Sequence, residues 1–92
     1  MPLDQNVTFK TPLRKNSRLR VPRVIRGQFK LEPTQILKVT ITLADTLGVH
    51  ESFFGKMRKD GIITIPPVSI SMIKEERPSL ENRILEVIIE PA

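Results

Sequence analysis

The stretch TFKTPLRKNSRLRVPRV, residues 8–24, decides the fold because the chain contains it twice. Shifted by 44 residues it aligns with SFFGKMRKDGIITIPPV, residues 52–68. The identical pairs are Phe9 and Phe53, Arg14 and Arg58, Lys15 and Lys59, Pro22 and Pro66, and Val24 and Val68. A second block, ILKVTI at 36–41, aligns with ILEVII at 84–89 after a shift of 48, so the second copy carries four extra residues, expected around 75–83. Two blocks in the same order predict an internal duplication.

Each copy predicts a strand, a tight turn, a second strand, a short helix and a third strand. The first strands are expected at about 7–15 and 52–59, and the turns at Asn16-Ser17 and Asp60-Gly61. Asp-Gly between apolar runs is typical of a two-residue type I′ turn, which needs positive φ at both positions. Proline then ends the second strand of each copy, because it has no N–H to donate to the ladder.

A short amphipathic helix is expected after the second strand of each copy. The first covers residues 23–31 and has a basic side opposite its apolar side, while Pro67 suits the first position of the second helix. The residues expected on the apolar sides are Ile25 and Phe29, with Val24 and Leu31 beside them, in the first copy, and Val68 and Met72 in the second.

Strand alternation predicts the core and the architecture. The residues expected to point inward are Leu19, Val21, Val39, Ile41, Ile63, Ile65, Val87 and Ile89. One copy of three strands cannot cover its own edges, so the two copies are expected to close a six-stranded barrel around a pseudo-twofold axis. We predict one mainly β domain over 1–92 with two short helices, repeats at about 7–43 and 52–91, and a linker at about 44–51. Because both copies lie in one chain, we expect a monomer.

The positive charge of the chain is concentrated in its first half. The formal net charge is +5, and residues 10–30 contain eight basic residues and no acidic one. A one-sided basic surface favours polyanions, and apart from Phe29, which is expected on the apolar side of the helix, the run has no aromatic residue for base stacking, so phosphate contacts to DNA or RNA are expected. The alternative is a solvated surface. The candidate nucleic-acid-binding residues are Arg14, Lys15, Arg18, Arg20, Arg23, Arg26 and Lys30.

The string LRKNSRLRVPRVIRGQFKLEPTQILKVTI, residues 13–41, resembles the repeat unit of AbrB-type transcription regulators. In order along the chain, that unit consists of a strand, a tight turn, a basic residue, an apolar strand that ends in Val-Pro or Ile-Pro, a short helix, a Gly-Asp loop and a last strand. The regulators are homodimers with swapped hairpins. Two units in one chain resemble the cradle-loop barrels, and the chain is most similar to the small, stand-alone, uncharacterised RIFT-type barrels of archaea. The resemblance covers nearly all of 7–91.

The resemblance implies a cradle-loop barrel and DNA binding. Arg18 and Arg26 match the places where the regulators carry arginines, just after the turn and on the helix. The second copy has Ile62 and Ile70 at these places, and the Gly-Asp loop is absent, so half of a symmetric DNA-binding surface would be missing.

No catalytic constellation can be identified in the sequence. The chain has no cysteine and one histidine, His50, and its four glycines form no phosphate-binding loop. Glu75, Glu76 and Glu81 are expected to be solvated. We therefore predict a cytoplasmic, non-enzymatic binding protein without metal, cofactor or membrane segment. The main alternative is a barrel that binds a protein partner or a small ligand, and the weakest is an enzyme on the same barrel.

Overall fold

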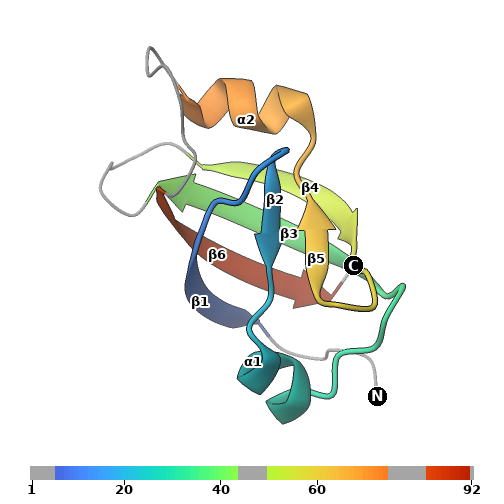
Figure 1. Cartoon of the computed structure of the whole chain (residues 1–92). Helices are drawn as coiled ribbons and strands as arrows, with labels where there is room; N and C mark the ends of the chain where they lie inside the picture. The colour runs from blue at the N-terminus through green and yellow to red at the C-terminus, as the bar shows by residue number, and fades with distance from the viewer. Residues whose placement is uncertain (1–5, 44–49, 75–82, 92) are drawn as a thin grey trace.

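The computed structural model describes residues 6–43, 50–74 and 83–91 (Figure 1). Over these residues the chain forms six strands and two helices. Their order is β1 (Val7–Pro12), β2 (Arg18–Arg20), α1 (Arg23–Gln28), β3 (Ile36–Leu43), β4 (Glu51–Lys56), β5 (Ile62–Thr64), α2 (Pro67–Lys74) and β6 (Ile84–Pro91). The mainly β fold and the element order agree with the prediction. The extra residues of the second copy and nearly all of the linker lie outside the described residues.

The strands form two sheets. The larger has the order β1-β6-β3-β4, and the smaller is the pair β2-β5. In Figure 1 the pair β2-β5 lies across one face of the larger sheet, and α1 and α2 lie at opposite ends of the molecule. The result is a small, barrel-like β fold.

Every pairing between the described strands joins the first half of the chain to the second. β1 pairs with β6, β3 with both β4 and β6, and β2 with β5, all antiparallel. The registers of the two edge pairings are equivalent. Shifting β1 forward by 44 and β6 back by 48 turns the pair Val7–Ile89 into Glu51–Ile41, which is a pair of β4 and β3. Leu19 faces Ile63, the residue 44 positions later. Both sheets therefore need strands from both halves.

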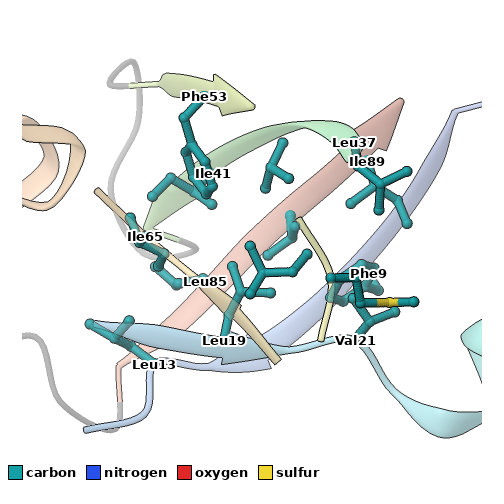
Figure 2. Packing of buried hydrophobic residues seen from close by; sticks show 14 of the residues in the cluster. Phe9, Leu13, Leu19, Val21, Leu37, Ile41, Phe53, Ile65, Leu85 and Ile89 are labelled. Carbon is teal, nitrogen blue, oxygen red and sulfur yellow. The ribbon is translucent and has the colours of Figure 1, made fainter. Parts of the chain in front are cut away.

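The hydrophobic core lies between the two sheets (Figure 2). Figure 2 shows Leu19 of β2 and Ile41 of β3 projecting into it from opposite sheets. β3 and β6 bury every second residue, as half-buried strands do. The predicted core is confirmed, because all eight of its residues have 0% exposure.

The first helix is shorter than predicted and ends at Gln28. Leu31 N–H donates to Arg26 O (3.0 Å), and Lys30 adopts φ 52° in the left-handed region. This is the geometry of a Schellman motif, which ends a helix. Ile25 and Phe29 pack against the core as predicted. Val24, which was expected beside them, is 75% exposed.

The second helix begins at Pro67 as predicted but buries a different face. Val68 and Met72 are 67% and 56% exposed, whereas Ser69 and Ile73 are 2% and 1% exposed. Ile70 packs against the core beside this second stripe. The segment carries two sets of residues four positions apart, so spacing alone fits both faces. The face with Ser69 is the buried one, because burying it also removes the large apolar side chains of Ile70 and Ile73 from water.

Both tight turns are closed as three-residue loops, so the prediction of a two-residue type I′ turn at Asp60-Gly61 is wrong, whereas Asn16 and Ser17 both have the predicted positive φ. In the second copy Arg58 N–H donates to Ile62 O (2.8 Å) and Gly61 N–H to Arg58 O (2.9 Å). Of the three loop residues only Gly61 has positive φ, at 86°. This is a type I turn followed by a left-handed glycine, which uses the same Asp-Gly pair as a type I′ turn. In the first copy Asn16 and Ser17 have φ of 61° and 56°.

Gly61 and Ser17 test this turn geometry. Gly61→Val should destabilise the protein by about 1–3 kcal/mol, because a β-branched residue resists positive φ. The new Cβ would also lie 2.7 Å from Arg26 Nε. Ser17→Gly should be neutral or stabilising, because glycine adopts the left-handed conformation without a steric penalty. Chemical denaturation measures both, and an unchanged midpoint for Gly61→Val would contradict the described loop.

Leu19 tests the core. Leu19→Ala should cost about 2–5 kcal/mol of unfolding free energy, because it leaves a cavity between the sheets. Val24→Ala is the matched control on the exposed side of α1 and should change that free energy by less than about 0.5 kcal/mol. Equal, small effects in equilibrium denaturation would show that Leu19 is not packed as described.

Candidate nucleic-acid interface

Four of the seven predicted basic residues surround one hollow beside β2. This hollow, of about 420 Å³, is called the turn hollow below, because residues of both tight turns line it. Its lining residues are Arg14, Lys15, Asn16, Arg18, Arg20, Asp60 and Ile62. Among the described residues, four basic side chains and one carboxylate therefore share a space large enough for a small anionic group.

A second hollow of about 470 Å³, called the proline hollow, lies next to the first. It is lined by Thr11, Pro12, Arg14, Arg20, Pro22 and Arg23. Arg14 and Arg20 line both hollows, so they form a common wall between them. The two hollows together bring five of the predicted basic residues onto one surface.

Strand geometry explains why these residues meet. Leu19 is buried at the centre of β2, so Arg18 and Arg20 lie on its opposite face, as predicted. Arg14 N–H donates to Arg18 O (2.8 Å), which fixes the first turn at one end of β2. Val21 N–H donates to Gly61 O (2.9 Å), which fixes the second turn at the other end. The turn hollow therefore spans the length of β2 between the two turns.

Asp60 supplies the carboxylate of the turn hollow. Its Oδ1 accepts a hydrogen bond from Ile62 N–H (3.2 Å), and its backbone oxygen accepts one from Arg20 Nε (3.1 Å). The bond from Ile62 lowers the pKa of the Asp60 carboxyl, and the positive charges of Arg58 and Arg20 lower it further. Asp60 therefore remains negatively charged at the end of the hollow next to the second turn.

The side chain of Arg26 is bound to other parts of the protein, so Arg26 does not belong to the exposed basic surface. Its side chain is half-buried, and its Nε donates to Val21 O (3.1 Å). The guanidinium also lies against Gly61, so it connects α1 to the second turn. Lys30 is exposed but follows the end of α1 and lines neither hollow. Arg23, Arg26 and Lys30 therefore do not form one exposed stripe along the basic side that was expected of the first helix.

Sequence reasoning did not include several residues that the structure adds to this region. Arg58 and Lys59 line a further hollow of about 400 Å³ together with Asp60, which borders the turn hollow as well. Ile62, the counterpart of Arg18 in the second copy, is only 6% exposed although it lines the turn hollow. The alignment of Arg14 with Arg58 and of Lys15 with Lys59 is the signal that could have pointed to the second turn.

The described residues offer little for metal or membrane chemistry. Within 6–43, 50–74 and 83–91, no three His, Cys, Asp or Glu side chains converge on a point that could hold a metal ion. His50 is exposed. Neither of the two helices in these ranges has the length and apolarity needed to span a bilayer.

Comparison with known proteins gives one informative likeness. No family model matches the chain, and no curated protein sequence matches it. The solution structure of PHS018 from Pyrococcus horikoshii is similar, with a TM-score of 0.77 and 16% sequence identity. The match covers 91% of this chain and 88% of that chain. At this identity the likeness shows the fold alone, which is a small, mainly β fold that also occurs in an archaeal protein.

The titration of Asp60 tests the electrostatics of the turn hollow. Its carboxyl should titrate below the usual range of aspartate, because the hydrogen bond from Ile62 favours the charged form. With a lowered folded-state pKa, its contribution to stability is complete above the unfolded-state pKa and is lost as the pH falls through the folded-state value. Carboxyl-carbon NMR over an acidic pH series measures the pKa directly. A midpoint at or above the ordinary aspartate value would contradict the described contact.

Proposed function

We propose that this protein is a non-enzymatic binding protein that binds DNA or RNA through phosphate contacts. The observation that carries the proposal is the pair of adjacent hollows that share Arg14 and Arg20. We call their basic lining residues the basic face; these are Arg14, Lys15, Arg18, Arg20 and Arg23.

The chemistry of the basic face suits phosphate groups. A guanidinium presents paired N–H donors that match two phosphate oxygens, and the basic face contains four of these groups. Arg14, Lys15 and Arg23 have exposed side chains. Two neighbouring hollows suit a ligand with phosphates at regular intervals better than a ligand with a single charge. Nucleic acids are the common polyanions of this kind.

The same surface suggests weak sequence preference. No aromatic residue lines either hollow, so stacking on bases is not supported. Contacts to phosphates position a protein on nucleic acid but carry no base information. We therefore propose similar affinity for different sequences.

The finer assignment of the fold forms part of this proposal. The equivalent registers of the two halves support a RIFT-type cradle-loop barrel with pseudo-twofold symmetry, related to the AbrB-type regulators. Of the two arginines that match the regulators, Arg18 lines the turn hollow, whereas Arg26 is bonded to Val21 O. Only Arg18 is therefore available for the role that the resemblance implies. We propose that the protein acts as a monomer in the cytoplasm.

A charge-matched pair of triple variants tests the proposal. Replacing Arg14, Lys15 and Arg23 with Gln should weaken binding to random-sequence duplex DNA and to RNA alike. The slope of log affinity against log salt should become shallower by roughly one unit per lost contact. The control replaces Lys10, Lys38 and Lys56 with Gln. These residues lie on the outer face of the four-stranded sheet, where each alternates with buried neighbours.

Titrations at two salt concentrations measure both variants. The control should keep most of the wild-type affinity, since its residues line neither hollow. No binding by the wild type at low salt, or an equal loss in both variants, would show that the basic face is only a solvated surface. A stable complex with a protein or a small ligand, without salt dependence, would then favour the alternative of a partner-binding barrel.

A further inference from the structure

A polyanion can bind a basic surface through diffuse charge, without any discrete site. We propose that the turn hollow is instead a specific site for one phosphate group, with Arg18 as its innermost donor. The inference goes beyond the proposed function, because a backbone phosphate of nucleic acid and the phosphate of a small molecule present the same chemistry to this site.

The first observation concerns Arg18 and Arg20 of β2 and Arg26 of α1. Arg20 Nε donates to Asp60 O (3.1 Å), and Arg26 Nε donates to Val21 O (3.1 Å). Arg18 Nε is buried, yet among the described residues it has no hydrogen-bond partner. A buried donor without an acceptor costs free energy, and a bound water or ion is one of the ways in which native proteins satisfy such a group.

The second observation is that Arg18 lines the turn hollow. Because Arg18 Nε has almost no exposed surface, the guanidinium must turn toward the hollow for a phosphate oxygen bound there to supply the acceptor that Nε lacks. The neighbouring Nη of the same guanidinium can bind a second oxygen of the group, in the paired geometry typical of arginine and phosphate. Arg18 is thus distinguished from Arg20 and Arg26, whose Nε groups already have carbonyl partners.

The positive and negative charges of the turn hollow lie toward opposite ends of β2. Arg14 and Lys15 belong to the first turn, next to Arg18, as shown by the bond from Arg14 N–H to Arg18 O. Asp60 belongs to the second turn, next to Arg20. The phosphate is therefore expected at the end near Arg18. The carboxylate of Asp60 repels a second anion, which limits the hollow to one phosphate group, and Ile62 offers an apolar contact to whatever the phosphate is attached to.

Inorganic phosphate is the probe for this site. Amide NMR of the full chain should show saturable shifts at residues 14–20 and 60–62 when phosphate replaces chloride at constant ionic strength. Arg18→Lys keeps the charge but removes the guanidinium, and it should weaken phosphate binding by roughly tenfold. Lys10→Arg is a charge-conserving control outside the basic face and should bind phosphate as the wild type does. Asp60→Asn should tighten binding, because it removes the opposing negative charge.

Two outcomes would overturn the site. In one, shifts spread without saturation over all exposed Lys and Arg residues. In the other, Arg18→Lys binds as tightly as the wild type. If Arg18→Lys does not fold, an Asp60→Asn variant with unchanged phosphate affinity rejects the inference independently. Salt-dependent binding of nucleic acid without saturable phosphate binding would reject the discrete site and leave the proposed function intact.

Competition identifies the source of the phosphate. A single-stranded oligonucleotide that displaces inorganic phosphate from residues 14–20 and 60–62, at lower concentration than AMP does, supports a backbone phosphate. AMP that displaces it at lower concentration than the oligonucleotide supports a small-molecule phosphate. Displacement by neither would contradict the site.

Discussion

The antiparallel pair of β3 and β6 is the constraint on which the rest of the structure depends. It joins Leu37–Leu43 to Leu85–Pro91 and forms the centre of the larger sheet. β1 pairs with the outer edge of β6, and β4 pairs with the outer edge of β3. The two halves of the chain are therefore connected on both sides of this central pair. The inner faces of β3 and β6 also supply six of the core side chains that have no exposure at all, so the β2-β5 pair packs on a surface that they create. These six are Leu37, Val39, Ile41, Leu85, Val87 and Ile89, each with 0% exposure.

The second cross-half pair, β2 with β5, determines the candidate site. Each tight turn is adjacent in sequence to its own strand, but the antiparallel pairing places the second turn beside Arg20 of the first half. The turn hollow consequently contains residues more than forty positions apart, from Arg14 to Asp60 and Ile62. The basic residues come from one half, and the carboxylate that limits their charge comes from the other.

The parts of the fold that the sequence predicted are those that follow from local periodicity and from the duplication. Alternation identified inward residues such as Leu19 and Ile89 correctly, because a half-buried strand has only two faces. The face of α2 was not predictable in this way, since Val68 and Met72 have the same spacing as Ser69 and Ile73. Asp-Gly located the second turn but not its type, because both loop types require a left-handed glycine.

The candidate site was predictable only in part, for a related reason. Alternation placed Arg18 and Arg20 on the outer face of β2, and the structure agrees. Arg26 differs from the neighbouring basic residues because its side chain is bonded to Val21 O and lies against Gly61. The spacing of residues along a helix cannot predict such a contact. Among the described residues the Nε of Arg18 likewise has no hydrogen-bond partner, and no pattern of residue types reveals this.

The long-range pairing also has a consequence for how the chain folds during synthesis. Partners in β1 and β6 lie between 72 and 82 residues apart, as the pairs Pro12–Ile84 and Val7–Ile89 show. Closing loops of this length slows folding, because the entropy of closure is lost before the contacts form. On the ribosome β1 emerges early and must wait unpaired until β6 has been made. An unpaired strand edge attracts other chains, and charged residues and proline discourage such association. Lys10 and Pro12 within β1 are residues of the kind that discourage such association while β1 waits for its partner.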